Sequence, residues 1–128
     1  MIVLDASVLI AAMTTEDAHH AAAVEILASR ALGVASLIHS VNLAEVLVGQ
    51  VPYGLEAFAA INIAQSGVDT IETDPDSPVR LARLREATKL GIPDCCALDA
   101  AIETGFAIAT FDDRLARAAT SLGIPLAA

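Results

Sequence analysis

Aromatic residues are scarce in this chain of 128 residues, which has three Phe, one Tyr and no Trp although 55% of it is hydrophobic. The interior must therefore be built from Ala, Val, Leu and Ile. A chain of this length is near the commonest size of a single domain and can bury a sizeable core without disulfides or a structural metal. Because no linker, repeat or low-complexity tract divides the sequence, we expect one domain over residues 1–128.

Cysteine is also scarce, and the only two cysteines, Cys95 and Cys96, are adjacent. Neighbouring residues on a helix point in directions too different for an ordinary disulfide. A metal or redox pair would need partners at ligand spacing, and the sequence offers none. We interpret both cysteines as reduced thiols that pack as small hydrophobic side chains.

Long apolar runs are absent. The longest stretches without charged residues, 31–44 and 57–68, fall short of the roughly 18 to 20 residues that a membrane-spanning helix needs. No basic cluster precedes Asp5, so the N-terminus does not resemble a secretory signal. These absences predict a cytoplasmic protein without a membrane span.

Basic residues are few, since seven Lys and Arg stand against sixteen Asp and Glu, for a net charge of -9. This balance argues against a protein that holds nucleic acid by bulk electrostatics, because phosphate binding normally rests on Lys and Arg. The distribution still allows a local basic rim. Six of the seven basic residues fall between positions 80 and 117, namely Arg80, Arg83, Arg85, Lys89, Arg114 and Arg117.

Short apolar segments alternate with helical patterns along the chain. The predicted strands cover residues 1–4, 34–37, 68–72, 106–110 and, as a possible last strand, 124–126. The predicted helices cover residues 6–13, 17–32, 42–50, 55–65, 79–90, 93–104 and 112–122. Strands that alternate with helices predict an α/β fold, with a central, mostly parallel sheet and helices on both of its faces.

Two carboxylates stand alone in apolar segments. Asp5 is the only charged residue among the first fifteen, and it follows an apolar strand at the end where open α/β sheets bind ligands. Glu45 is the only charged residue between positions 31 and 55, within an apolar helix. A carboxylate that faces apolar neighbours is costly unless it is paired or binds a metal. The alternative is that Glu45 reaches solvent from the edge of its helix.

A third carboxylate, Asp94, lies at the start of a predicted helix. A step of 100° per residue places Asp94 on the same inward side as Leu98 and Ile102. Asp99 and Glu103 then fall on the opposite side, which we expect to be a solvated face. The alternative role for Asp94 is that of a helix N-cap.

Asp112 and Asp113 follow a predicted strand and begin a predicted helix. One of them can cap that helix, and because one cap needs only one Asp, the second is free for other chemistry. Asp113 could also simply complement the helix dipole in the first turn.

Oxygen ligands without a histidine nearby in sequence suit hard cations such as Mg²⁺ or Mn²⁺ rather than zinc. Such ions lower the pKa of a bound water, orient it for attack on phosphorus and neutralise the leaving oxygen. The sequence also contains His19, His20 and His39, and His19 and His20 start an Ala-rich helix with no partner from the acidic site within reach in the sequence. We interpret them as surface or helix-start residues rather than ligands.

Four segments of the sequence together resemble a known family. They are Ile2 to Ile10, which contains Asp5; Asn42 to Leu47, which contains Glu45; Ile92 to Asp94; and Thr110 to Asp112. In this order and spacing, over all 128 residues, the chain is similar to PIN-domain toxins of the VapC type. The resemblance implies a PIN-like domain and a metal-dependent endoribonuclease, the toxin of a toxin-antitoxin pair.

The resemblance also implies which residues act. Asp5, Glu45, Asp94 and Asp112 would form the catalytic, metal-binding site, with Ser7 and Thr110 as supporting hydroxyls. The chain departs from the family at Asn42, where Thr or Ser is usual; its amide can still hydrogen bond and support the site. A homodimer, a small antitoxin partner that pushes a basic side chain into the acidic site, and a structured RNA substrate such as tRNA or rRNA follow from the same resemblance.

A local basic rim would supply contacts to such an RNA. Four basic residues lie within one predicted helix, and we expect at least one of them to contact RNA phosphate: Arg80, Arg83, Arg85 or Lys89.

Two other functions compete with this interpretation. An aspartyl-phosphate enzyme also has an Asp after its first strand, but here the second residue after Asp5 is Ser7 rather than another Asp, and no Lys precedes Lys89. A catalytically silent PIN-like scaffold would only bind a partner. The presence of all four carboxylates argues against that second alternative.

Overall fold

The computed structural model describes residues 1–29 and 35–127, and its centre is a four-stranded sheet. The strands are β1 (Ile2–Leu4), β2 (Ser36–His39), β3 (Val68–Ile71) and β4 (Ala107–Ala109). They lie in the order β3-β2-β1-β4, and every pair is parallel. The predicted last strand, 124–126, is reduced to a single bridge between Ile108 and Leu126 beside β4.

Helices fill the connections between the strands. They are α1 (Ala6–Met13), α2 (His20–Ala28), α3 (Ser40–Val48), α4 (Glu56–Gln65), α5 (Ser77–Thr88), α6 (Ile92–Thr104) and α7 (Asp113–Ser121), with a short 3-10 helix, η2, at Val51–Tyr53. The chain therefore has the predicted α/β architecture. None of the helices in the described part of the chain has the length and apolar character that crossing a membrane requires.

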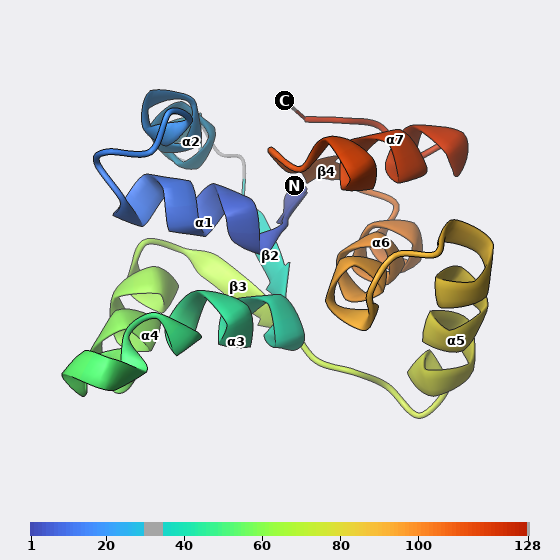
Figure 1. Ribbon diagram of the computed structural model, residues 1–128, viewed down its shortest axis with the longest axis horizontal. Coiled ribbons are helices and arrows are strands. Elements are labelled where there is room, and N and C mark those ends of the chain that lie inside the picture. The colour runs from blue at the N-terminus through green and yellow to red at the C-terminus, as the bar shows by residue number, and fades with distance from the viewer. Residues whose placement is uncertain (30–34, 128) are drawn as a thin grey trace.

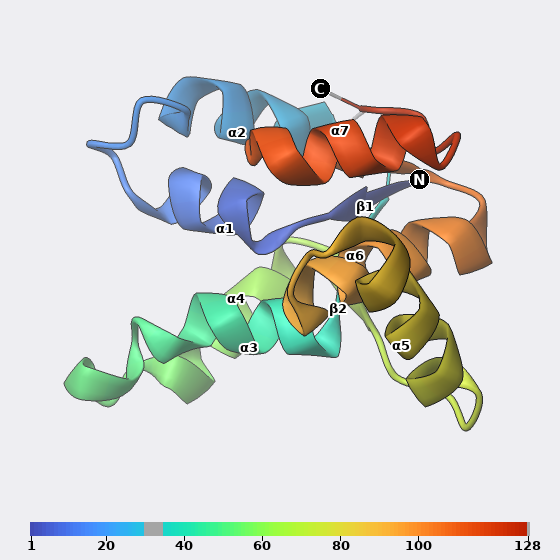
Figure 2. The ribbon, with the colours of Figure 1, turned by 45° about the vertical axis from the view of Figure 1, so that its right-hand side comes forward.

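Each face of the sheet has its own hydrophobic core. Val3 and Ile108 point into a cluster with α5, α6 and α7, whereas Leu4 and Ala109 point into a cluster with α1, α2, α3 and α4. This alternation follows from the two-residue period of a strand. Figure 1 shows these two groups of helices on opposite sides of the sheet, and Figure 2 shows them from a second direction. The prediction that helices cover both faces is confirmed.

Local hydrogen bonds explain where two helices differ from the predicted ranges. The second helix starts at His20 rather than at Asp17, because the Asp17 side chain accepts from the backbone N–H of His19 and closes a turn. Helix α3 starts two residues before the predicted Asn42, because His39 Nδ1 accepts from the N–H of Val41 and caps it. Residues 30–32 of the predicted helix and residue 34 of the predicted strand lie outside the described residues.

Helix α6 is buried almost all round, which corrects the predicted inward and outward faces. Every residue from Cys95 to Ala101 is buried, whereas Ile102, predicted to face inward, is 45% exposed. The reason is that α6 packs against α3, α5 and the sheet at once. The two cysteines are free and buried, and burial raises the pKa of Cys96 to about 11, so these thiols are inert filler as predicted.

The predicted solvated face of α6 is also wrong at Asp99, which is buried. Arg80 Nε contacts Asp99 Oδ1 at 2.8 Å and Glu103 Oε1 at 3.0 Å, and Arg80 Nη2 contacts Asp74 Oδ2 at 2.6 Å. These ion pairs join the start of α5 and the turn before it to α6. The 100° periodicity identified the side of the helix, but it could not reveal that a cation from another helix covers that side.

We expect Leu98→Ala to lower the free energy of unfolding by about 2 to 5 kcal/mol, because Leu98 is fully buried and its removal leaves a cavity. Urea denaturation measures this change. Ile102→Ala, one turn later on the same helix, is the control and should cost well under half as much, because Ile102 is 45% exposed. Equal losses of unfolding free energy for the two variants would show that α6 does not pack against the sheet as described.

Candidate active site

The candidate site lies where β1 and β4 end side by side. Asp5 follows β1, and its backbone N–H donates to the carbonyl of Ala109 at 3.0 Å. The chain leaves β1 towards β2 on one side, while β4 lies on the other side. Parallel α/β sheets bind ligands at such a switch point, beyond the carboxyl ends of the strands.

Two hydroxyl groups hold the carboxylate of Asp5, which is only 5% exposed. Ser7 Oγ donates to Asp5 Oδ2 at 2.8 Å, and Thr110 Oγ1 donates to the same oxygen at 2.7 Å. Each hydroxyl also accepts a backbone N–H, Ser7 from Phe111 and Thr110 from Asp112, both at 3.0 Å. Ser7 and Thr110 therefore lie at the positions expected for supporting hydroxyls and join the end of β1 to the loop after β4.

Asp112 both caps a helix and acts through its charge on Asp94. Its Oδ1 accepts from the N–H groups of Arg114 and Leu115, at 2.9 and 3.1 Å, and so caps α7. The sequence suggested that capping and chemistry belong to different aspartates. In the structure, the aspartate that caps the helix is also the one whose charge acts on Asp94, and its second oxygen accepts no hydrogen bond from the described residues.

Glu45 is exposed, which corrects the idea that burial among apolar neighbours sets it apart. The open alternative, that this side chain reaches solvent, is the correct one. Asn42 fixes its position: Asn42 Nδ2 donates to Glu45 Oε1 at 3.1 Å and to the carbonyl of Pro93 at 2.9 Å. The amide thus connects Glu45 on α3 to the residue just before Asp94.

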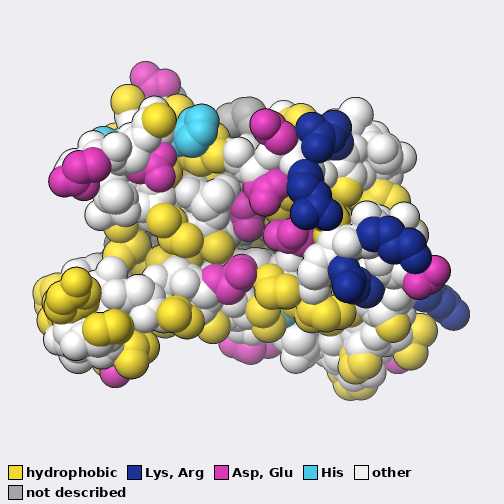
Figure 3. Space-filling view, viewed as in Figure 1, with side chains coloured by type: hydrophobic (Ala, Val, Ile, Leu, Met, Phe, Trp, Pro, Cys, Tyr) yellow, Lys and Arg dark blue, Asp and Glu magenta, His cyan; other side chains and the backbone are white. Residues whose placement is uncertain are grey.

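The pKa of Asp94 shows that the four carboxylates interact. Burial raises this pKa most, and the negative charges of Asp5, Asp112 and Glu45 raise it further, while Arg114 opposes them. The structure therefore brings the charges of the other three predicted residues to bear on the carboxyl of Asp94. Figure 3 shows acidic side chains near the centre of one face, with Lys and Arg side chains beside them over α7 and α5.

Among residues 1–29 and 35–127, no group of three or more His, Cys, Asp or Glu side chains is close enough to hold a metal ion. This spacing still fits Mg²⁺, because Mg²⁺ keeps several waters and takes only one or two carboxylates directly. The donors are all oxygens, and the buried Asp5 forms no ion pair with a described residue. The four carboxylates therefore suit a hydrated hard cation.

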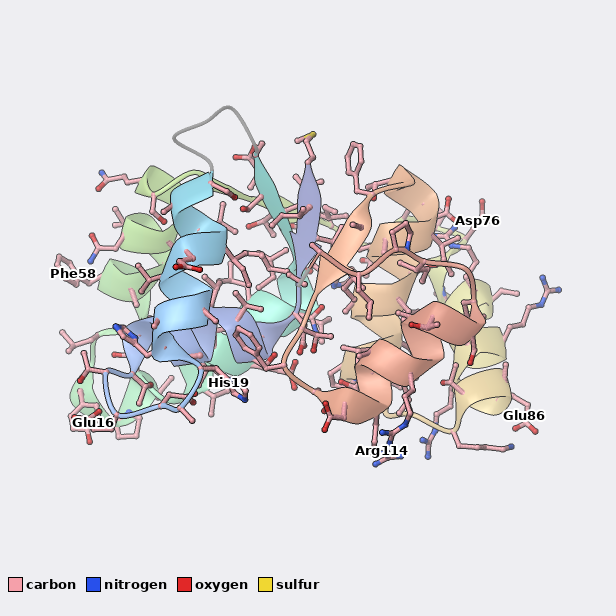
Figure 4. All side chains as sticks on the ribbon, turned by 90° about the horizontal axis from the view of Figure 1, so that it is seen from above. Glu16, His19, Phe58, Asp76, Glu86 and Arg114 are labelled. Carbon is pink, nitrogen blue, oxygen red and sulfur yellow. The ribbon has the colours of Figure 1, made fainter. Side chains whose placement is uncertain are left out.

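The histidines lie at helix starts, as predicted. His20 Nδ1 is 2.9 Å from the carbonyl of Ala11, and His39 caps α3 with a pKa that burial lowers, which favours the neutral ring that the cap needs. His19 has a role that the sequence did not reveal. Its ring stacks on Phe111, with centroids 4.5 Å apart and planes 5° apart, so the segment before α2 lies against the site. Figure 4 shows His19 and Arg114 on the same side of the molecule.

The four basic residues predicted to contact RNA differ in their surroundings. Arg80 is occupied by three carboxylates, and Lys89 Nζ contacts Glu86 Oε1 at 2.8 Å. Arg85 Nη1 donates to the carbonyls of Lys89 and Leu90, at 2.9 and 2.7 Å. Arg83 is exposed and forms no ion pair within the described residues. Of these four residues, Arg80 therefore has the most carboxylate partners.

Comparisons with known proteins agree with this fold. The model of the PIN domain family matches residues 2–121. No curated protein matches the sequence significantly.

Three solved structures illustrate the likeness. VapC20 of Mycobacterium tuberculosis, described as a toxin that cleaves the Sarcin-Ricin loop, has a TM-score of 0.72 at 17% identity, covering 92% of this chain and 95% of that one. VapBC2 of Rickettsia felis, bound to a DNA fragment from its promoter, has a TM-score of 0.70 at 19% identity, covering 98% and 97%. A toxin-antitoxin complex from Klebsiella pneumoniae has a TM-score of 0.66 at 24% identity, covering 88% and 87%.

We expect Asp94→Asn to raise the melting temperature at pH 7 in chelator, because it removes a charge from among like charges. Because the pKa of Asp94 is raised in the folded protein, its protonated carboxyl stabilises the fold at pH values below the pKa of about 3.9 that Asp has in the unfolded chain. That contribution is lost as the pH rises through the raised folded-state pKa. The advantage of the variant should therefore shrink as the pH falls towards 4. Thermal melts over this pH range measure it.

Asp113→Asn is the matched control, because it removes the same charge from the same end of the site but does not appear among the causes of the Asp94 shift. Its melting temperature should stay within a degree or two of the wild type. A lower melting temperature for Asp94→Asn than for wild type at pH 7 would show that Asp94 stabilises the helix start instead.

Proposed function

Because this chain belongs to the PIN domain family, we propose that it is a metal-dependent endoribonuclease that acts in the cytoplasm as the toxin of a toxin-antitoxin pair. The observation that carries the proposal is the convergence of Asp5, Glu45 and Asp112 on Asp94 at the carboxyl ends of β1 and β4. Stability does not explain such a cluster, since like charges disfavour one another. A bound divalent cation would explain the cluster.

The proposed ion is Mg²⁺ or Mn²⁺, bound among Asp5, Glu45, Asp94 and Asp112 by one or two carboxylates directly and by the others through its waters. When bound, it lowers the pKa of water and neutralises charge on a phosphodiester. The protein's own groups orient the ligands. Ser7 and Thr110 hold Oδ2 of Asp5, so that Oδ1 accepts no hydrogen bond from the described residues. Such outer partners fix ligand geometry.

Asn42 performs the same orienting role on the opposite side of the site. Its amide holds Glu45 and the backbone before Asp94 at a fixed separation. The Oδ1 atom of Asn42 is buried and has no hydrogen-bond partner among the described residues. A Thr or Ser at this position would be shorter and could not make both donations.

The substrate that we propose is a structured RNA, tRNA or rRNA, and the partner is a cognate antitoxin. An exposed apolar surface supports a protein partner. Six large hydrophobic residues are exposed from the end of α3 through α4: Val48, Val51, Tyr53, Leu55, Phe58 and Ile61. Together with a cavity of about 410 Å³ between α1 and α4, this surface is typical of protein interfaces. The same argument supports a homodimer, and the acidic site would attract a basic antitoxin side chain.

We expect the purified protein to cleave tRNA or rRNA only with Mg²⁺ or Mn²⁺, and Asp94→Asn to lose cleavage by about a hundredfold or more, since even outer partners of a metal ligand are worth 10–100-fold. Gel analysis of RNA ends measures cleavage, and circular dichroism checks the fold. Asp113→Asn is the control and should keep most activity. Full cleavage in excess chelator would contradict the metal site.

The competing function is a PIN-like scaffold that binds a partner without catalysis. Wild-type protein that leaves tRNA and rRNA intact with either metal, yet binds a co-encoded small protein, would favour the scaffold over the nuclease.

A further inference from the structure

A cavity of about 340 Å³ lies between the end of α5 and α7, beside the acidic site. Arg114 and Arg117, one turn apart on α7, are its charged lining residues. Thr88 and Ser121 add hydroxyls, and no carboxylate is among the residues that line it. Figures 1 and 2 both show the end of α5 next to α7.

Neither arginine of this cavity forms an ion pair with a described residue. In residues 1–29 and 35–127, the ion pairs of the protein involve Arg80 and Lys89, and neither Arg114 nor Arg117 takes part in one. The chain has a net charge of -9, so acidic partners are plentiful elsewhere. Two adjacent cations without a carboxylate therefore stand out in this protein.

The helix itself does not account for Arg114. This residue lies in the first turn of α7, where the N–H groups make the helix end positive and a cation is disfavoured. Asp112 and Asp113 offset that cost only in part. A bound anion between α5 and α7 would use both guanidinium groups.

The cavity is adjacent to the proposed catalytic residues. Asp112 caps the helix that carries both arginines, and the charge of Arg114 lowers the pKa of Asp94. From Asp112 to Arg117 the helix advances about 7.5 Å. At about 3.4 Å per nucleotide along one strand, this rise corresponds to about two nucleotides. If the phosphodiester bond to be cleaved lies at the carboxylates, a neighbouring phosphate of the same strand would thus reach the arginines.

We propose that the cavity lined by Arg114 and Arg117 binds a backbone phosphate of the RNA substrate, one or two nucleotides from the bond that is cleaved. This inference rests on the proposed function and deepens it. Guanidinium groups donate in a planar fork that matches phosphate oxygens. Since a phosphate is the same in every nucleotide, the contact adds affinity and register but no sequence preference.

Binding measurements test the proposal without catalysis. A fluorescently labelled single-stranded RNA oligonucleotide is titrated with protein in chelator, at several salt concentrations. We expect Arg117→Gln to weaken binding about tenfold and to reduce the slope of log K against log salt by about 0.7. Arg117→Lys is the matched control, since it keeps the positive charge at the same position, and it should keep the salt slope of wild type.

Kinetics supply a second measurement. With Mg²⁺ and tRNA as substrate, loss of a remote phosphate contact should raise KM and leave kcat within about twofold. Arg117 is the residue to change here, because the charge of Arg114 acts on Asp94 and would alter kcat as well. The double variant Arg114→Gln, Arg117→Gln should lose about 1.4 units of salt slope in the binding experiment.

The outcomes separate this inference from the proposed function. If wild type cleaves RNA but Arg117→Gln binds it with the affinity and slope of wild type, the phosphate site is wrong and the nuclease stands. If wild type binds no RNA, both the cavity and the nuclease are contradicted. If wild type binds RNA with the expected Arg117 effects but never cleaves it, only the nuclease fails.

Discussion

Two hydroxyl groups make it possible to bury the carboxylate of Asp5. A buried carboxylate is costly unless it is hydrogen-bonded, and Ser7 and Thr110 both donate to its Oδ2. Their oxygens in turn accept the N–H groups of Phe111 and Asp112. The position of the loop after β4, and with it the position of the carboxylate that caps α7, therefore depends on the charge at the end of β1.

Four arginines of this acidic protein lie in two kinds of surroundings. Arg80 is surrounded by carboxylates and joins α5 to α6, and Arg85 binds the carbonyls at the end of α5. Arg114 and Arg117 line a cavity without carboxylates. Interactions with a polyanion depend on local charge within about a Debye length of 8 to 10 Å. For that reason a net charge of -9 does not prevent a local contact with phosphate.

Several details could not be predicted from the sequence, and they share one cause. Asp99 was expected in solvent because helix periodicity carries no information about which helix packs on which side. Glu45 was selected for its apolar neighbours in the sequence, yet Val46 faces the core while Glu45 faces outward. Burial lowers the pKa of His39, which favours the neutral ring that caps α3. Each of these depends on residues distant in the chain.

The sequence by itself determined the α/β architecture, the helix that follows each strand and the isolation of Asp5 at the end of the first strand. Those features depend on local periodicity and on the cost of a charge among apolar residues, and both can be read over a few residues. The tertiary structure alone decided that β1 lies beside β4, that Asn42 connects Glu45 to the start of α6, and which arginines are free of carboxylates. Strand pairing and the hydrogen bonds of the site join residues about a hundred positions apart, so only the packing of both hydrophobic cores against one sheet could set them.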